Sequence, residues 1–316
     1  MTPTLDDLLD RLHVVSLPMR VQFRGITTRE LALIDGPAGW GEFGAFLEYG
    51  YAEAAHWLAA AVESAYRTPP APLRDRIDVN ATVPAVPAAQ VPEILARFPG
   101  ARTAKVKVAE PGQTLDDDVA RVDAVRALVS TVRVDANGAW SVAQAVEAAK
   151  VLGPLEYIEQ PCATVDELAQ VRRQIDVPVA ADESIRKADD PLAVVRAGAA
   201  DIAVLKVAPL GGISALLGIA AQIDIPVVIS SALDSAVGIA IGLAAASTLP
   251  KLDHACGLGT GRLFVEDVTD PVEAINGYLP VAAVTPDPAR LQALAAPPER
   301  RQWWIDRVKA CFPLLS

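Results

Sequence analysis

Five ionisable residues recur at nearly constant spacing through the middle of this 316-residue chain. Each one stands at or near the end of a short apolar run, in the order Lys107, Asp135, Glu159, Asp182 and Lys206. The successive separations are 28, 24, 23 and 24 residues. One strand, one helix and two short loops need about that many residues, so the spacing predicts a repeated strand–helix unit.

The residue types in this series indicate the chemistry. Asp135, Glu159 and Asp182 would face one cavity if their strands lie side by side, and crowded carboxylates either take up protons or bind a divalent cation. Ligands that are all oxygen favour a hard ion such as Mg²⁺ or Mn²⁺. A cation nearby favours the neutral form of Lys107 or Lys206, so either amine could accept a proton near neutral pH. The series therefore predicts metal-assisted acid–base catalysis.

A β/α barrel is the fold that would bring these residues together, because its parallel strands point their carboxyl ends at one mouth. The five strands are predicted at 104–108, 132–137, 157–161, 177–184 and 202–209. A first strand at 77–83, a seventh at 226–231 and an eighth with its loop at 253–261 complete the series. The barrel domain, residues 76–262, is short against about 250 residues for a complete barrel, which fits compact helices and a missing final helix.

Residues 1–75 lack the repeat and are predicted to form a separate, small α+β domain. Two strands are expected at 12–23 and 29–34, and a helix at 52–66. Pro69, Pro70 and Pro72 mark the linker to the barrel. The tail, residues 263–316, is expected to pack back on this domain, with a helix near 299–309.

Composition excludes several classes of protein. A net charge of −11 without a long basic run disfavours nucleic acid and anionic membranes as partners. The three cysteines form no C-x-x-C pair, which argues against a disulfide framework and a zinc site. The acidic start is unlike a signal peptide, and the apolar run 235–247 is too short to span a bilayer. We expect a cytoplasmic enzyme for a small-molecule carboxylate, either a monomer or a homo-oligomer.

Five motifs in order resemble those of the enolase superfamily. They are K-x-K at Lys105 and Lys107, VDANGAW at 134–140, EQP at 159–161, ADES at 181–184 and LKVAP at 205–209. The resemblance continues in RVQFRGITTRE at 20–30 and WGEFGAFLEY at 40–49, so it covers nearly the whole chain. Within the superfamily the set is similar to the muconate-lactonizing subgroup, and there to the short actinobacterial o-succinylbenzoate synthases.

This resemblance implies a fold and a core site. The fold would be a modified TIM barrel, (β/α)7β, under an α+β capping domain. Lys107 would transfer the proton, Lys206 would face it across the mouth, and Mg²⁺ or Mn²⁺ would bind three carboxylates. Those metal ligands would be Asp135, Glu159 and Asp182. The seventh strand carries no histidine, which argues against the mandelate-racemase-like branch.

Further residues are expected around this core. Lys105 would tune the pKa of Lys107 through like charge, while Asn137 and Glu183 would support the metal ligands. Substrate contacts are expected from the loop 23–28 of the capping domain, from hydroxyl or backbone donors after the seventh strand, and from the glycine-rich eighth strand loop. The residues assigned to these contacts are Arg24, Ser230, Ser231 and Gly257.

The reaction that the resemblance implies is the metal-dependent syn-dehydration of 2-succinyl-6-hydroxy-2,4-cyclohexadiene-1-carboxylate to o-succinylbenzoate, through an ene-diolate, in menaquinone biosynthesis. The same two lysines also suit an N-acylamino acid racemase or a dipeptide epimerase, because one can deprotonate and the other reprotonate an α-carbon. A Schiff-base aldolase that uses Lys107 or Lys206 is a third alternative, and a binding protein on a barrel scaffold is a fourth.

Overall fold

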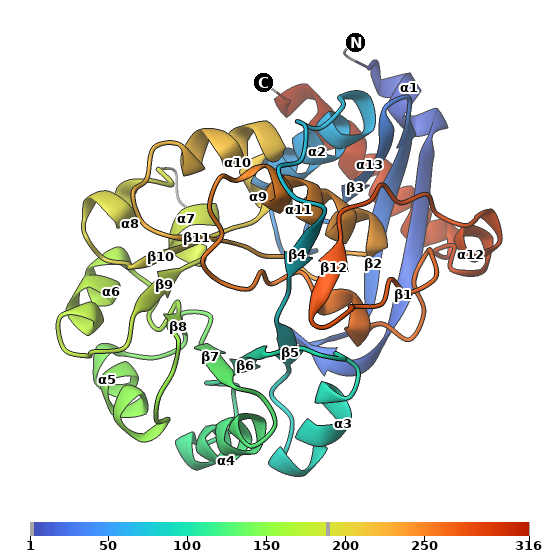
Figure 1. Ribbon diagram of the computed structural model, residues 1–316. Helices are drawn as coiled ribbons and strands as arrows, with labels where there is room; N and C mark the ends of the chain where they lie inside the picture. The colour runs from blue at the N-terminus through green and yellow to red at the C-terminus, as the bar shows by residue number, and fades with distance from the viewer. Residues whose placement is uncertain (1–2, 188–189, 316) are drawn as a thin grey trace.

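The computed structural model describes residues 3–187 and 190–315, and its main element is a curled parallel sheet (Figure 1). Within those residues the sheet has seven strands, paired in their order along the chain from β5 to β11. The strands are β5 (Ala81–Val83), β6 (Thr103–Lys107), β7 (Thr131–Asp135), β8 (Ile158–Glu159), β9 (Val179–Ala181), β10 (Ile202–Leu205) and β11 (Val227–Ile229). This architecture confirms the predicted barrel class.

The two edges of this sheet are joined through a short segment at Cys256 and Gly257. Gly257 forms a parallel bridge with Ser230, which follows β11, and Cys256 forms one with Val79, just before β5. The N–H of Gly257 donates to the carbonyl of Ile229 at 2.8 Å. The predicted eighth strand is therefore reduced to two isolated bridges, which connect the edges of the sheet.

The barrel helices lie outside the curled sheet, and three of them begin with the same capping box. In α4 (Leu115–Arg126), α5 (Val142–Val151) and α6 (Val165–Arg172) the N-cap residues are Thr114, Ser141 and Thr164. The third helical N–H donates to the cap oxygen, and the cap N–H donates to that residue's side chain, which fixes each helix start. The barrel helices are α3 (Val91–Leu95), α4 (Leu115–Arg126), α5 (Val142–Val151), α6 (Val165–Arg172), α7 (Glu183–Arg186), α8 (Ala193–Arg196), α9 (Val207–Leu210), α10 (Ile213–Ala220) and α11 (Ala236–Thr248), and 3-10 turns occur at η1 (Ala88–Gln90) and η2 (Thr260–Leu263).

The first barrel strand is shorter than predicted. The sequence indicated one strand over residues 77–83, but β4 (Arg76–Asp78) pairs antiparallel with β12 (Tyr278–Pro280), and only β5 joins the barrel. Between them, the N–H of Val79 donates to the carbonyl of Gly277 at 2.9 Å. The alternating pattern was correctly interpreted as strand. The prediction of one continuous barrel strand was wrong, because β4 pairs with β12 in the C-terminal tail.

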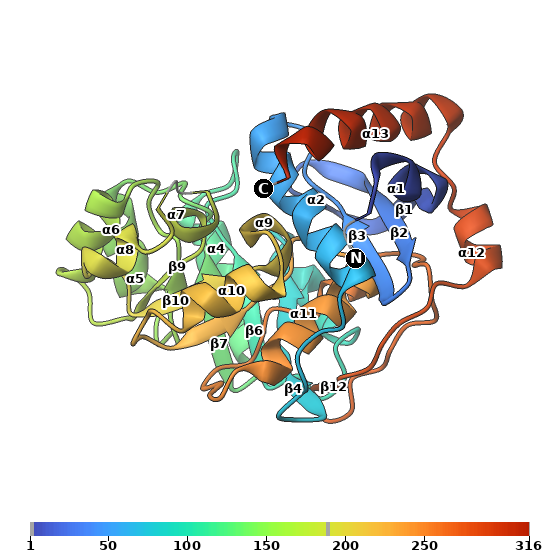
Figure 2. The ribbon, with the colours of Figure 1, turned by 90° about the horizontal axis from the view of Figure 1, so that it is seen from above.

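A second layer is built from the two ends of the chain and lies beside the barrel (Figure 2). Its antiparallel sheet has the order β1-β2-β3, and α2 packs on it, with α13 packed against α2. The rings of Phe43 and Trp304, both buried, meet edge to face at 5.4 Å. The domain limits set from the sequence stay a prediction. The elements are β1 (Leu12–Phe23), β2 (Ile26–Gly36), β3 (Gly39–Phe43), α1 (Leu5–Asp10), α2 (Tyr51–Tyr66), α12 (Pro288–Ala293), α13 (Pro298–Cys311) and η3 (Phe312–Leu314).

Helix α2 lies so close to β3 that position 41 tolerates only glycine. A Cβ added at Gly41 would overlap the backbone carbonyl of Ala61, which cannot move away as a side chain could. We expect Gly41→Ala to lower the free energy of unfolding by about 2 kcal/mol or more, measured by urea unfolding. The control is Gly218→Ala in α10, where a Cβ meets open space and the better helix former is neutral or stabilising. Equal stability of the two variants would contradict this packing argument.

No helix among the described residues is both long and apolar enough to cross a membrane.

Candidate active site

The repeated ionisable residues meet at one end of the barrel. Lys107, Asp135 and Glu159 are the last residues of β6, β7 and β8, and they are direct neighbours in register. Asp182 and Lys206 follow β9 and β10 immediately. Because these strands are parallel, their carboxyl ends lie at the same edge of the sheet. The spacing of the sequence thus located a real cluster.

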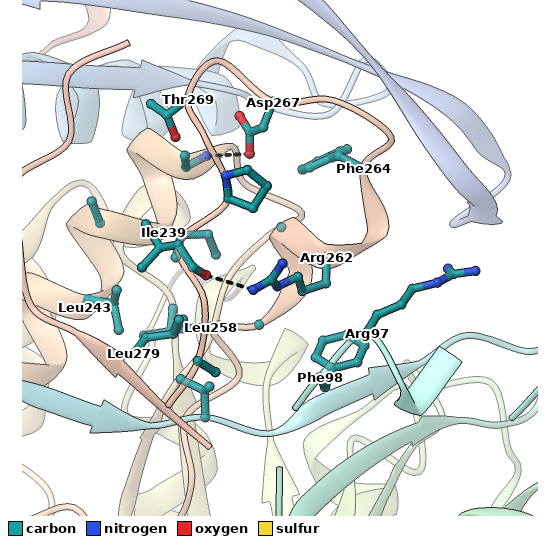
Figure 3. A pocket seen from close by; sticks show the side chains of 18 of the residues that line it. Arg97, Phe98, Ile239, Leu243, Leu258, Arg262, Phe264, Asp267, Thr269 and Leu279 are labelled. Atoms are coloured by element: carbon teal, nitrogen blue, oxygen red, sulfur yellow. Dashed lines mark hydrogen bonds between the residues drawn. The ribbon is translucent and has the colours of Figure 1, made fainter. Parts of the chain in front are cut away.

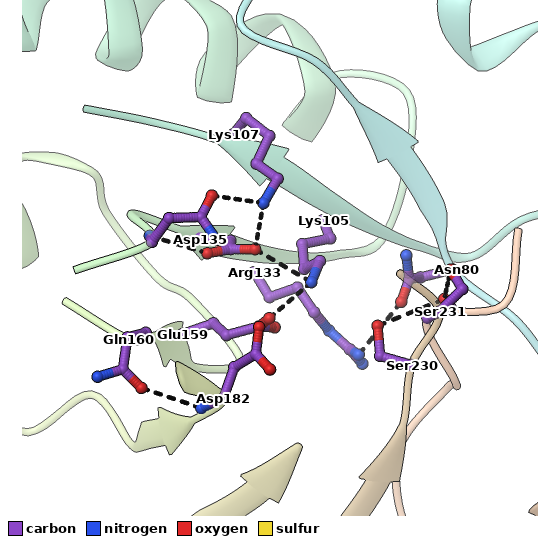
Figure 4. Close-up of polar contacts among 12 residues, drawn as sticks. Asn80, Lys105, Lys107, Arg133, Asp135, Glu159, Gln160, Asp182, Ser230 and Ser231 are labelled. Carbon is purple, nitrogen blue, oxygen red and sulfur yellow. Dashed lines mark hydrogen bonds and ion pairs between the residues drawn. The ribbon is translucent and has the colours of Figure 1, made fainter. Parts of the chain in front are cut away.

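Two lysines of β6 hold two of the carboxylates (Figure 4). Lys105 Nζ lies 2.7 Å from Glu159 Oε1 and 3.2 Å from Asp135 Oδ2. Lys107 Nζ lies 2.5 Å from the same Asp135 Oδ2. Lys105 and Lys107 therefore lie on the same side of their strand, as alternation along a strand requires. Asp135 bridges the two ammonium groups.

The third carboxylate, Asp182, is fully buried between two cations. Lys206 Nζ lies 2.6 Å from its Oδ2, and Arg186 Nε lies 2.9 Å from its Oδ1. Arg186 also donates to Glu183 Oε1 at 2.7 Å and to the Tyr49 hydroxyl at 3.0 Å, which links the cap to the barrel. Neither Arg186 nor Tyr49 was among the site residues predicted from the sequence. The i,i+4 spacing from Asp182 was a usable signal for Arg186, whereas the contact with Tyr49 depends on the tertiary fold.

Asn137 connects the two sides of the cluster. Its Oδ1 accepts a hydrogen bond from Lys107 Nζ at 2.7 Å, and its Nδ2 donates to Glu183 Oε1 at 3.1 Å. Its backbone has φ +48, a left-handed conformation that asparagine adopts more readily than most residues. Gln160, also missed, has φ +40 and accepts from the N–H groups of Asp182 and Ser184. These amides fix the loops that carry the charges.

The two lysines of β6 have pKa values shifted in opposite directions. Burial lowers the pKa of Lys105, but the carboxylates of Glu159 and Asp135 outweigh it and raise the pKa above its usual range. The pKa of Lys107 is lowered, because burial and the charge of Lys105 outweigh the attraction of Asp135. Lys107 is therefore the lysine of this strand that gives up a proton more easily.

The pKa values of the three carboxylates are also shifted in opposite directions by their surroundings. Burial and the neighbouring Asp135 raise the pKa of Glu159 to about 7. Burial also acts to raise the pKa of Asp135 and of Asp182, but their cationic neighbours outweigh it and lower both values. Of the three, Glu159 is thus the carboxylate whose charge is least compensated.

A cavity of about 40 Å³ lies at this mouth and brings together most of the residues singled out from the sequence. Glu159, Asp182 and Glu183 are outside its lining and contact the residues that form it. The Ser231 hydroxyl donates to the carbonyl of Gly257 at 2.8 Å, so it is engaged within the protein. The predicted site residues in the lining are Arg24, Lys105, Lys107, Asp135, Asn137, Lys206, Ser230, Ser231 and Gly257.

The capping layer is tied to the loop after β11 by two buried ionisable side chains. Arg29 Nε donates to the carbonyl of Leu233, a lining residue of the cavity, at 3.1 Å, and its guanidinium lies 4.5 Å from the ring of Phe46. Glu42 accepts from the N–H of Ser235, the cap of α11, at 3.1 Å. A displacement of the cap would therefore move one wall of the mouth.

The donor set fits a hard divalent cation in its chemistry. All three carboxylates supply oxygen, they come from adjacent strands, and Glu159 Oε2 is buried without a hydrogen-bond partner. In residues 3–187 and 190–315, no three acidic, His or Cys side chains converge as a ready-made ligand set. Each of the three carboxylates contacts a lysine, and Lys105 contacts both Glu159 and Asp135.

Below the charged cluster, Arg133 of β7 is completely buried. Its guanidinium pairs with Glu156 Oε2 at 2.5 Å and donates to the Tyr157 hydroxyl and the carbonyl of Ala255, each at 2.8 Å. We expect Arg133→Met to lower the free energy of unfolding by about 3 kcal/mol, because it leaves these acceptors unpaired. Chemical denaturation measures this.

The control for that variant is Lys150→Met. Lys150 pairs with Glu147 at 3.6 Å on the surface, where ion pairs contribute little, so its loss should cost less than about 0.5 kcal/mol. If both variants unfold at the same denaturant concentration, the Arg133 contacts do not stabilise the barrel.

Comparison with known proteins shows the family to which this chain belongs. The model of the enolase N-terminal domain-like family matches residues 14–65, and that of the enolase C-terminal domain-like family matches residues 88–287. The o-succinylbenzoate synthase of Mycobacterium marinum is 76% identical over 315 residues, which cover 99% of this chain and 96% of the relative. This chain belongs to the o-succinylbenzoate synthase family of the enolase superfamily. The family member of Mycobacterium leprae is 74% identical and covers 100% of this chain and 95% of its own length.

Solved structures support the same fold. The muconate lactonizing enzyme of Pseudomonas fluorescens, complexed with muconolactone, matches with a TM-score of 0.77 at 23% identity, covering 90% of this chain and 98% of that chain. The enzyme of Pseudomonas putida matches with a TM-score of 0.74 at 21% identity and covers the same shares. At this identity the likeness concerns the fold alone. Members of the superfamily depend on a divalent metal.

Proposed function

We propose that this chain catalyses the syn-dehydration of 2-succinyl-6-hydroxy-2,4-cyclohexadiene-1-carboxylate to o-succinylbenzoate, in menaquinone biosynthesis. The observation that carries the proposal is the identity of 74–76% over the full chain with relatives named o-succinylbenzoate synthase. The paired lysines at the barrel mouth supply acid–base groups that such a reaction needs. We also propose a cytoplasmic location, which suits a metabolic enzyme that acts on a small-molecule carboxylate.

We assign Asp135, Glu159 and Asp182 as the residues that hold Mg²⁺, with Mn²⁺ as a substitute. When bound, a divalent cation supplies positive charge that stabilises the negative charge developing on the substrate carboxylate. Asn137 and Glu183 support this set, because their mutual hydrogen bond connects the loops that follow β7 and β9. Lys105 contacts both Glu159 and Asp135, at 2.7 and 3.2 Å.

Lys107 is the proposed base and acid. Its lowered pKa, from burial and from Lys105, favours the neutral amine that accepts the α-proton. The C–H bond breaks and the proton passes to Nζ. The C–O bond of the ring hydroxyl then breaks on the same face, and Nζ returns that proton to the departing hydroxyl. Water leaves, the ring becomes aromatic, and Lys107 ends in its starting state.

Lys206 has a different proposed role. It stands after β10 and is paired with Asp182 at 2.6 Å, so its charge is compensated by a carboxylate that is fully buried. We assign it as the cation that faces the ring across the mouth and stabilises the intermediate, including through a cation–π contact.

Substrate entry requires movement of the cap. The cavity of about 40 Å³ is far below the size of a pocket for a succinyl-substituted ring, for which about 300 Å³ or more is usual. The turn between β1 and β2 covers it, with the Phe23 ring 5.5 Å from Lys107 Nζ and the Arg24 guanidinium 4.1 Å from the Phe46 ring. This turn is the proposed entrance and contacts the substrate through Arg24.

The experiment that tests the function compares two reactions of the Mg²⁺-loaded protein. One assay follows dehydration of the cyclohexadiene substrate, and the other follows α-proton exchange of N-succinylamino acids in D₂O. Fast dehydration supports the synthase assignment. Rapid exchange without dehydration would move the assignment to an N-acylamino acid racemase or a dipeptide epimerase on the same two lysines.

A further inference from the structure

One segment of the capping layer reaches the charged cluster directly. Residues 44–50 connect β3 to α2, and Tyr49 in this segment is 6% exposed. Its hydroxyl accepts a hydrogen bond from Arg186 Nη1 at 3.0 Å. Arg186 ends α7, the single helical turn that follows β9 and Asp182. Two parts of the chain that are 137 residues apart therefore meet at one guanidinium group.

The guanidinium of Arg186 uses each of its three nitrogens for a different partner. Nε donates to Asp182 Oδ1 at 2.9 Å, and Nη2 donates to Glu183 Oε1 at 2.7 Å, while Nη1 donates to Tyr49. The Arg186 side chain is 3% exposed and lines the mouth. A buried planar group with a partner on every nitrogen cannot turn without breaking one of these contacts. The position of Tyr49 thus constrains the carboxylate of Asp182.

The other end of this connection is fixed within the capping layer. Arg307 of α13, which is buried, donates to the carbonyls of Phe46 and Tyr49, each at 2.8 Å. The Tyr49 ring lies edge to face with the ring of Phe46 at 5.5 Å and with that of Trp57 at 6.1 Å. Because backbone and ring are both held in this way, Tyr49 moves together with the cap.

Asp182 depends on this arrangement for its orientation. Its Oδ1 accepts from Arg186, and its Oδ2 accepts from Lys206 at 2.6 Å. Side chains that orient a metal ligand without touching the metal typically change the metal affinity by about 10- to 100-fold when they are lost. An opening of the cap, which substrate entry requires, withdraws Tyr49 and leaves Arg186 with one partner fewer. Arg186 is then free to turn away from Asp182.

We propose that Tyr49 and Arg186 are positioning residues that couple closure of the cap to cation binding at Asp182. The proposal rests on the assignment of Asp182 as a metal ligand, made above. Coupling between two equilibria is reciprocal, so the closed cap strengthens cation binding, and the bound cation strengthens cap closure by the same factor. The cation is then held most tightly when the cap covers the mouth.

Tyr49→Phe isolates this contact, because it removes the hydroxyl and leaves the charges and the aromatic packing unchanged. The Kd for Mg²⁺ follows from the thermal unfolding midpoint at increasing MgCl₂. We expect this Kd to rise about threefold or more, since a hydrogen bond from a charged donor is lost. The matched control is Tyr278→Phe, because the Tyr278 hydroxyl accepts from Arg102 Nη2 at the same 3.0 Å and Tyr278 lies outside the mouth lining. It should keep the wild-type Kd.

Hydrogen exchange measures the reciprocal effect. Mg²⁺ should slow amide exchange in residues 46–54 of the wild type, where the N–H of Tyr49 donates to the carbonyl of Phe46. In Tyr49→Phe this slowing should be largely lost. A hydroxyl with a purely structural role would lower the unfolding midpoint without Mg²⁺ and leave both the Kd and the effect of Mg²⁺ on exchange unchanged.

Arg186→Lys is the second variant, because a lysine keeps the charge but has no planar fork to hold three partners at once. Its Kd for Mg²⁺ should rise about tenfold or more. An unchanged or lower Kd in both variants, or an equal rise in Tyr278→Phe, would overturn the coupling alone, provided that Mg²⁺ stabilises the wild type. A wild type that Mg²⁺ does not stabilise would overturn the coupling together with the assignment of Asp182.

Discussion

Lys107→Ala is expected to lower the rate of dehydration by about three orders of magnitude, because it removes the only amine assigned to both proton transfers. The lowered pKa of Lys107 comes from burial and from Lys105. Lys105 does not replace it, because the Lys105 ammonium group is held by Glu159 at 2.7 Å. Steady-state kinetics with the cyclohexadiene substrate measures the loss.

The control for this prediction is Lys150→Ala, which removes a lysine from the exposed face of α5 and should retain full activity. Thermal unfolding checks that Lys107→Ala still folds, as expected because Asp135 keeps Lys105 at 3.2 Å. A Lys107→Ala protein with more than about a tenth of the activity would show that another group moves the proton.

The spacing of residues along the chain was enough to predict the fold class and most of the ionisable cluster at the barrel mouth. The repeat of about 24 residues indicated the barrel, because a strand and a helix in alternation have a narrow range of lengths. It also located Lys107, Asp135 and Glu159, since residues at the ends of neighbouring parallel strands must be neighbours in space. Consecutive strands joined by a helix usually pair side by side, so the order of these residues along the chain predicts their order in the sheet.

Contacts between distant segments were out of reach. The break between β4 and β5 depends on β12, which lies in the C-terminal tail. Tyr49 reaches Arg186 only because the cap packs over the mouth. A cavity of about 420 Å³ between α11 and the connection to β12 (Figure 3) depends on the path of residues 264–284, and no periodic pattern indicates where such a connection runs. Each of these features needs coordinates of two segments that the sequence does not relate.

Removal of the divalent cation with EDTA is expected to abolish dehydration, and Mg²⁺ or Mn²⁺ should restore it. Glu159→Gln is the sharper test of where the cation binds. Glu159 Oε2 has no hydrogen-bond partner, and the Oε1 of glutamine can still accept from Lys105, so this substitution leaves the fold intact. It removes one of the three anionic ligands, and we expect weaker metal binding and at least about a hundredfold lower activity.

Thermal unfolding with increasing MgCl₂ separates metal binding from catalysis. A cation that binds only the folded protein stabilises it by about 2.7 kcal/mol at a hundred times its Kd, so the wild-type midpoint should rise. The midpoint of Glu159→Gln should rise much less. Glu147→Gln on the surface of α5 should follow the wild type. If Glu159→Gln gains as much from Mg²⁺ as the wild type, the cation binds elsewhere. In that case the pairing of Glu159 with Lys105 would be structural, and the assignment of the metal ligands would have to change.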